Sequence, residues 1–334
     1  MGADSKIEWC NHTFNPWRGC TAISPACDHC YAKTLVEGRL SGDFGQRVRS
    51  AASTWKQPLA WNRKAEREGV RYRVFCASLA DVFDNQVPAE WRADLWALIR
   101  ATPHLDWLLL TKRPQNIAGM LPPDWGDGWP TVWLGATVEN QTEADRRIPH
   151  LLAVPAAVRF LSCEPLLGPV ELDCIPWPAD WMRPVDDPSD GFHALRYQPH
   201  HITWVICGGE SGPGSRPMHP AWARSLRDQC EATGVAFHFK QWGEWGTAAI
   251  SSSTGHPVFR QFHDFQHWVN KASTWVRGGI CLDADGRELK IGADFMHARD
   301  EGKFPVTIMH KVGKRAAGRL LDGRAWDQFP GGAA

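Results

Sequence analysis

The stretch LDWLLLTKRP, residues 105–114, is a near-continuous apolar run that ends in Thr111, Lys112 and Arg113. It follows AEWRADLWALIRAT at 89–102, where apolar side chains recur at helical spacing. A short apolar run after an amphipathic helix is typical of a parallel strand that is buried on both faces. The sequence therefore predicts a helix and then a strand in this region.

The same alternation extends in both directions along the chain. Further strands are predicted within RVFCASLA (73–80), PTVWLGATVEN (130–140), AVRFLSCEPLLG (157–168), HITWVICGGESG (201–212) and GVAFHFKQWG (234–243), and EWCNHTF (8–14) is a candidate seventh strand. Strands that alternate with helices are typical of an open α/β sheet or of a β/α barrel. We expect a partial or complete parallel β/α barrel of the TIM type with a C-terminal α+β appendage.

Two stretches lie outside this alternation. Residues 169–200 are rich in proline and aspartate and are expected to form a long loop or lid. The barrel with an N-terminal cysteine loop would then span residues 1–243, and the appendage would span 244–334. Within the appendage, the sequence predicts a hairpin over 280–292, turning at an Asp-Gly pair, and a basic helix over 311–330.

The composition limits the possible partners. The 334 residues are 43% apolar and 22% charged, which excludes wholesale disorder. Lys and Arg total 37, as do Asp and Glu, so any contact with nucleic acid must come from a local patch. No apolar run approaches the roughly 20 residues that span a bilayer, and the polar start does not resemble a secretory signal. We expect a cytoplasmic protein without a membrane partner.

Every predicted strand ends in polar residues. Because the carboxyl ends of parallel strands meet at one edge of the sheet, these side chains are expected to share a pocket. Besides Thr111, Lys112 and Arg113, the strand ends carry Ser78, Asp81, Thr137, Glu139, Asn140, Ser162, Glu164, Glu210, Ser211, Lys240 and Gln241.

A cysteine motif precedes this series. The segment NPWRGCTAISPACDHCYA, residues 15–32, holds Cys20, Cys27 and Cys30 with the spacing C-x6-C-x2-C. Three thiolates in a loop rich in helix breakers indicate soft ligands for a metal. The spacing alone supports equally a zinc site, with Cys10 or His29 as fourth ligand, and an iron–sulfur cluster. Three cysteines would leave one iron of a four-iron cluster open to a small molecule.

These cysteines, ending in C-x2-C-Y-A before a β/α series, resemble those of the radical S-adenosylmethionine enzymes. From residue 13 to 330 the chain is most similar to a phage-associated family of three-cysteine radical-SAM-like proteins of unknown reaction. The matching segments are TFNPWRGCTAISPACDHCYA, VFCASLADVFD, LDWLLLTKRP, WLGATVENQ, RFLSCEPLLG, WVICGGESG, FHFKQWG and GRLLDGRAWDQFP.

The resemblance implies that Cys20, Cys27 and Cys30 hold a 4Fe-4S cluster whose open iron binds S-adenosylmethionine. Reduction by an electron donor protein would then generate a 5′-deoxyadenosyl radical, which takes a hydrogen atom from the substrate. The chain departs from the superfamily in its x6 spacing, where x3 is commonest. In the superfamily a Gly-Gly-Glu motif after the second strand binds the cofactor amine. Here Gly208-Gly209-Glu210 comes about four strands later, so Ser78 and Asp81 are rival candidates.

The remaining cofactor and catalytic candidates each have a plainer alternative. Lys112 and Arg113 could bind a carboxylate or an anionic substrate, or form a solvated strand end. Glu139 and Asn140, beyond Thr137, could bind a ribose diol or cap the next helix.

No catalytic residue is assigned. Cys163, like Cys76 and Cys207, is either a hydrogen-atom donor or a buried packing residue. Glu164 and Glu210 are candidates for acid–base chemistry, or carboxylates at helix starts.

The substrate class is the least defined. A surplus of 19 tryptophans, and the phage association, favour a nucleotide or nucleic-acid base as substrate of modification or repair. The basic segment 303–325, with Trp326 and Phe329 nearby, could follow a phosphate backbone, or be the solvated face of a helix. The alternative function is a non-catalytic, zinc-stabilised module that binds nucleic acid or protein.

Overall fold

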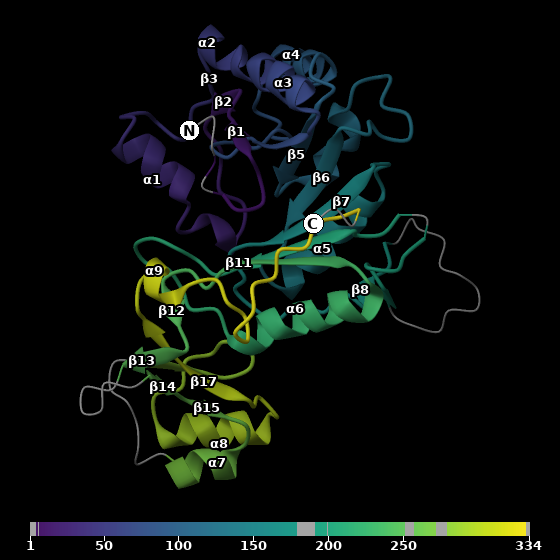
Figure 1. The fold of residues 1–334 in the computed structure, drawn as a ribbon. Helices are drawn as coiled ribbons and strands as arrows, with labels where there is room; N and C mark the ends of the chain where they lie inside the picture. Colours follow the sequence, from purple (N-terminus) through teal and green to yellow (C-terminus); the bar gives the residue numbers. More distant parts are fainter. Residues whose placement is uncertain are drawn as a thin grey trace.

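The central feature of the molecule is one parallel sheet (Figure 1). The computed structural model describes residues 5, 7–178, 191–198, 200–250, 257–271 and 279–331. Within them, seven strands form a sheet in the order β1-β4-β5-β6-β7-β10-β11. Their bounds are β1 His12–Phe14, β4 Tyr72–Cys76, β5 Leu105–Thr111, β6 Val132–Thr137, β7 Val158–Cys163, β10 Trp204–Gly208 and β11 Ala236–Gln241.

The strand order distinguishes a barrel from an open doubly wound sheet. Each strand of this sheet lies beside the sheet strand that precedes it in sequence, and all six pairings are parallel. A doubly wound sheet reverses its strand order at a switch point, and this sheet does not. The fold is a partial β/α barrel, as the sequence predicted, and the candidate strand at residues 8–14 is its first strand, β1.

Helices cover the outer face of the sheet. They are α2 Ala52–Trp55, α3 Gln57–Glu68, α4 Ala89–Arg100, α5 Gln141–Leu152 and α6 Pro220–Thr233, and α1 Tyr31–Gly38 follows the cysteine loop. Because successive residues of a strand point to opposite faces, Leu109 packs in the large outer core and Leu108 in a smaller inner one. Among the described residues, no helix is both long and apolar enough to cross a bilayer.

Aromatic side chains fill the inner core, which closes the floor of the half-barrel. Trp9 contacts Phe75 with ring centroids 4.7 Å apart, and Trp204 lies 6.0 Å from Trp133. The other members of this core are Cys10, Leu108, Phe160 and Ile206. Part of the tryptophan surplus is therefore a packing feature, and the free space lies above this floor.

We expect Gly135→Ala to destabilise this floor. Gly135, on β6, lies so close to the Phe160 ring that an added Cβ would stand 2.3 Å from a ring carbon. Such overpacking should lower the free energy of unfolding by about 1–3 kcal/mol. Urea denaturation would measure this loss, with Gly119→Ala as control, because a Cβ there meets nothing within 4 Å. Equal stability of the two variants would contradict the packing described here.

The described part of the long segment 169–200 packs against the outer helices. Strands β8 Ile175–Pro176 and β9 Gly191–Phe192 pair within it, and the Leu172 backbone N–H donates to Gln229 of α6 at 2.7 Å. Leu172 belongs to the outer core. These residues thus extend the helical layer, and none of them lines the pocket at the strand ends, where a lid would lie. The remainder of the predicted lid, 179–190 and 199, falls outside the described residues.

A second, antiparallel sheet forms the appendage. It contains β12 Trp245–Gly246, β15 Gln261–Phe262, β16 Gly279–Leu282 and β17 Val306–Lys311, with the pair β13 Ala248–Ile250 and β14 Pro257–Phe259 nearby. Helices α7 Phe265–Lys271 and α8 Gly292–Asp300 complete it. At the predicted hairpin, Leu282 and Glu288 form one antiparallel bridge around the Asp-Gly turn, but the main partner of β16 is β17.

The prediction of a basic helix over residues 311–330 is wrong for most of this segment. Only α9, Lys314–Ala317, is helical, because Gly313 and Gly318 on either side adopt positive φ. The chain then returns to the edge of β11, where the Phe239 N–H donates to the Trp326 carbonyl at 2.9 Å. Trp326 is 6% exposed and belongs to the outer core, so it offers no face for stacking a base.

His219 gives the fold a predicted dependence on pH. Its Nδ1 accepts the Ala221 N–H at 3.1 Å at the start of α6, so capping needs the neutral ring. Burial, assisted by Arg224, lowers the pKa of His219 to about 4. Because the unfolded chain binds this proton more readily, the contribution of His219 to stability is fully present above a pH of about 6.5. It is lost as the pH drops towards about 4.

We expect the free energy of unfolding to lose roughly 2–3 kcal/mol across this interval through His219. The variant His219→Asn keeps a capping acceptor but does not titrate. Urea denaturation at several pH values should therefore give a flatter profile for the variant than for the wild type. Identical slopes would show that His219 does not contribute to the pH dependence.

Candidate metal and cofactor site

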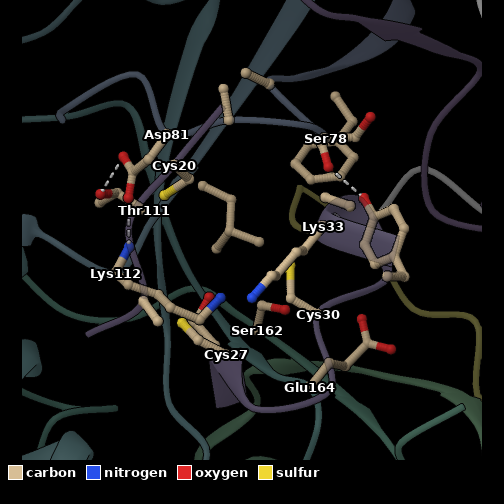
Figure 2. A pocket seen from close by; sticks show the side chains of 18 of the residues that line it. Cys20, Cys27, Cys30, Lys33, Ser78, Asp81, Thr111, Lys112, Ser162 and Glu164 are labelled. Carbon is tan, nitrogen blue, oxygen red and sulfur yellow. Dashed lines mark hydrogen bonds between the residues drawn. The ribbon is translucent and has the colours of Figure 1, made fainter. Parts of the chain in front are cut away.

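A pocket of about 920 Å³ lies at the carboxyl ends of the strands (Figure 2). Trp9, Phe75 and Leu110 line its apolar part. Many of the predicted polar residues share it: Cys20, Cys27, Cys30, Ser78, Asp81, Thr111, Lys112, Arg113, Thr137, Ser162, Glu164, Ser211, Lys240 and Gln241. Its volume is within the range of cofactor and substrate sites. The prediction that strand ends share one pocket is thus met for these residues.

The three cysteines of the motif line one pocket from different parts of the N-terminal loop. Cys20 follows β2 (Trp17–Arg18), which pairs with β3 (Val48–Arg49). Cys27 ends the short 3-10 helix η1 (Pro25–Cys27), and Cys30 is the N-cap residue of α1. Figure 2 shows their sulfur atoms directed towards the pocket. All three are free and half-buried, whereas Cys174 is exposed and the other six cysteines are buried. Partial exposure in one pocket is the property expected of thiols that bind a cofactor.

The spacing of these thiols bears on which metal they suit. No three His, Cys, Asp or Glu side chains of the described residues are close enough to share one metal ion. Thiolates that share one zinc ion at about 2.3 Å must lie within about 4.6 Å of one another. In a four-iron cluster each thiolate binds a different iron, so a wider separation is tolerated. Three half-buried thiols that line one pocket are a donor set that a four-iron cluster can use, with one iron left free.

The proposed fourth ligands lie elsewhere. Cys10 is buried in the inner core, where its Sγ donates to Ser5 Oγ at 3.4 Å. Burial raises the pKa of its thiol. His29 is exposed, and neither residue lines the pocket.

Buried ion pairs hold the cysteine loop in place, and they involve several residues that the sequence suggested as cofactor ligands. Asp81 accepts from Arg113 Nη1 at 3.1 Å, and Arg113 Nη2 donates to the Thr21 carbonyl at 2.9 Å. A neighbouring pair, Arg47 and Asp84, holds the Thr21 side chain through Arg47 Nη2 at 2.8 Å. The first cysteine is thus anchored through the residue that follows it.

Glu139 anchors the middle of the loop. This fully buried carboxylate accepts the Ala26 N–H at 3.2 Å through Oε1 and Arg147 Nη1 at 2.8 Å through Oε2. Asn140 accepts the Glu143 N–H at 3.0 Å and so caps α5. Neither residue lines the pocket. Asn140 therefore caps the next helix, which was the plainer of its two predicted roles. Glu139 supports the cysteine loop and does not face a ribose site.

Glu210 anchors the loop from the opposite side. Its carboxylate accepts from Arg216 at 2.6 Å and 2.9 Å, and Arg216 Nη2 donates to the Pro25 carbonyl at 2.9 Å. Gly208 and Gly209 lie behind the pocket, where an added Cβ would stand 2.5 Å from Glu164 Oε1 and 2.0 Å from the Trp242 carbonyl oxygen, respectively. None of these three residues lines the pocket, so the structure gives the Gly-Gly-Glu sequence a packing and anchoring role.

Glu164 is the catalytic candidate that faces the pocket. Its Oε1 lies 3.0 Å from Lys240 Nζ, and both side chains are partly exposed there. Cys163 points to the opposite face and is completely buried in the outer core, as are Cys76 and Cys207. Burial raises the pKa of the Cys163 thiol well above its usual range. These three cysteines are therefore buried packing residues and not hydrogen-atom donors, since none of them lines the pocket.

Sequence reasoning missed two kinds of residue. Tyr31, whose Oη donates to the Ser78 carbonyl at 2.5 Å, and Lys33 both line the pocket just after Cys30. Their closeness to the motif at the start of a predicted helix was the available signal. Arg147 and Arg216 hold the loop from distant helices and loops, and no local pattern marks them.

The fold and site together define a partial β/α-barrel protein with a thiol-lined pocket at its strand ends. The chain belongs to the family described as "Protein of unknown function (DUF5131)", whose model matches residues 4–330. No curated protein matches it in sequence.

Several solved structures are distantly similar. One is spore photoproduct lyase complexed with dinucleoside spore photoproduct, with 10% identity and a TM-score of 0.41 over 78% of this chain and 71% of that chain. Another is a variant of that enzyme with bound AdoMet and the same dinucleoside, with 10% identity and a TM-score of 0.41 over 91% of this chain and 77% of that chain.

Proposed function

We propose that this protein is a radical S-adenosylmethionine enzyme in which Cys20, Cys27 and Cys30 hold a 4Fe-4S cluster. The observation that carries the proposal is the placement of three half-buried thiols in one large pocket at the strand ends. When bound and reduced by a donor protein, the cluster and S-adenosylmethionine would supply a 5′-deoxyadenosyl radical for hydrogen abstraction. The phage association implied by the sequence resemblance stays a prediction.

The chain's own residues would bind and orient the cofactor. Lys33 and Lys112 extend into the pocket (Figure 2), and within the described residues neither forms an ion pair. By contrast, Arg113 and Lys240, which also line it, are paired with Asp81 and Glu164. An ammonium group without a carboxylate partner is suited to an anionic ligand group. We therefore assign the cofactor carboxylate to Lys112, with Lys33 facing the same space.

Lys112→Gln is expected to weaken binding of S-adenosylmethionine about 10- to 150-fold, because a charge-assisted hydrogen bond contributes about 1.5–3 kcal/mol. Calorimetry on the anaerobic, iron-loaded protein would measure the dissociation constant. The control is Lys311→Gln, since Lys311 is exposed on β17 and lies outside the pocket. Equal affinity of the two variants would remove Lys112 from the cofactor site.

We further propose a nucleotide or nucleic-acid base as substrate. The pocket combines the aromatic side chains of Trp9 and Phe75 with the polar pair Glu164 and Lys240. The apolar floor can take the flat body of a base, and a carboxylate beside an ammonium can hydrogen-bond to the base edge. In a duplex, the base would have to leave the stack to reach this depth.

Metal analysis of protein purified without oxygen tests the proposal against the zinc-stabilised binding module. A radical enzyme is expected to contain about four irons and four acid-labile sulfides per chain, with visible absorption that is lost on reduction. A colourless protein with one equivalent of zinc would contradict the proposal and support the module.

A further inference from the structure

Asp81 and Arg113 form a buried ion pair next to Cys20. Asp81 Oδ1 accepts from Thr111 Oγ1 at 2.7 Å and from the Phe83 N–H at 3.0 Å. Its Oδ2 accepts from the Lys112 N–H and from Arg113 Nη1, both at 3.1 Å. With side-chain exposures of 6% and 8%, the carboxylate and the guanidinium are both withdrawn from water. The orientation of Arg113 is therefore fixed by the ends of two neighbouring strands.

This ion pair reaches a cysteine sulfur. Arg113 Nη1 also donates to Cys20 Sγ at 3.5 Å, and Nη2 holds the carbonyl of Thr21. Among the described residues, no side chain donates a hydrogen bond to the sulfur of Cys27 or Cys30. The three thiols are thus unequal, and only the first receives a cationic donor. Since Asp81, Cys20 and Thr21 occupy both terminal nitrogens, Arg113 is poorly placed to bind a cofactor carboxylate as well.

We infer that Arg113 is a positioning residue that raises the reduction potential of the metal centre by donating to Cys20 Sγ. The inference rests on the proposed function. Reduction adds one electron from the donor protein and leaves the bonded atoms unchanged, so the ligand sulfurs become more negative. A buried cation that donates to one of these sulfurs stabilises the reduced state more than the oxidised state. Asp81 keeps the guanidinium in the orientation that this contact requires.

The test compares Arg113→Gln with Arg216→Gln in the reconstituted full-length protein. Arg216 also holds the cysteine loop, through the Pro25 carbonyl and the Asp28 carboxylate, but it touches no cysteine sulfur. Midpoint potentials would be measured by anaerobic redox titration followed by electron paramagnetic resonance, without S-adenosylmethionine. Arg113→Lys, which retains the charge, serves as the conservative variant if Arg113→Gln does not fold. Iron content and melting temperature would be recorded for every variant.

The expected result is a more negative midpoint potential for Arg113→Gln than for the wild type and Arg216→Gln, with Arg113→Lys between them. Unchanged potentials in both Arg113 variants, or equal shifts in Arg113→Gln and Arg216→Gln, would overturn the role of Arg113 while leaving the proposed function intact. A wild-type protein that takes up no iron would instead overturn the proposed function, and this inference would fail with it.

Discussion

Replacing Cys27 by alanine is expected to abolish both iron retention and the cleavage of S-adenosylmethionine. Cys27 lies between the two other thiols of the loop and lines the pocket with them. Because each thiolate would hold a different iron, loss of one leaves two protein ligands for the cluster. Iron content should fall from about four per chain to well below one. Colorimetric iron and sulfide assays on anaerobically reconstituted protein would measure the fall.

Cys174→Ala is the matched control, because Cys174 is the exposed free cysteine and does not line the pocket. It should retain the iron content and absorption spectrum of the wild type. Cys10→Ala should do the same, since Cys10 lies in the inner core. Full iron content in Cys27→Ala, or a loss of iron in Cys10→Ala equal to that in Cys27→Ala, would show that the ligand set is wrong.

Arg147→Met is expected to be the most destabilising single substitution near the site. Arg147 and Glu139 are 1% and 0% exposed and form a 2.8 Å ion pair beneath the cysteine loop. Removing the cation leaves a buried carboxylate without its charged partner, which typically costs about 3–5 kcal/mol. Since Glu139 also accepts the Ala26 N–H, we expect the loop to loosen and iron uptake to slow.

Chemical denaturation would measure the loss in free energy of unfolding, and timed reconstitution would measure iron uptake. Arg146→Met is the control on the same helix, because Arg146 is 51% exposed and its partner Glu143 keeps an ion pair with Arg147 in that variant. Its effect should stay within about 0.5 kcal/mol. The double variant Glu139→Gln with Arg147→Met should recover part of the lost stability, since a neutral amide replaces the unpaired charge. Similar losses for Arg146→Met and Arg147→Met would contradict the anchoring role.

The barrel strands could be predicted because local sequence determines them. A strand such as LDWLLLTKRP is buried on both faces, so its apolar run is visible in the sequence, and its polar end marks the pocket edge. The C-terminal segment could not be predicted in this way. Its charges are compatible with a helix, but it pairs with β11 and buries Trp326, which is a consequence of long-range packing.

The sequence predicted many of the residues that line the pocket, but it did not predict which residue has which role. The three cysteines and Lys112 do share one pocket. Sequence proximity to a strand end did not distinguish Glu164, which faces the pocket, from Glu139 and Glu210, which hold the loop. The difference depends on Arg147 and Arg216, whose positions are set by tertiary structure. A carboxylate at a strand end is therefore ambiguous until its partner is known.

The radical chemistry of this protein can be measured by incubating the anaerobically reconstituted protein with S-adenosylmethionine and a strong reductant and quantifying 5′-deoxyadenosine by chromatography. The wild type is expected to form 5′-deoxyadenosine, and Cys27→Ala is expected to form none above background. A wild-type protein that carries a full complement of iron, binds S-adenosylmethionine and still releases no 5′-deoxyadenosine would contradict the assignment of radical chemistry to this protein.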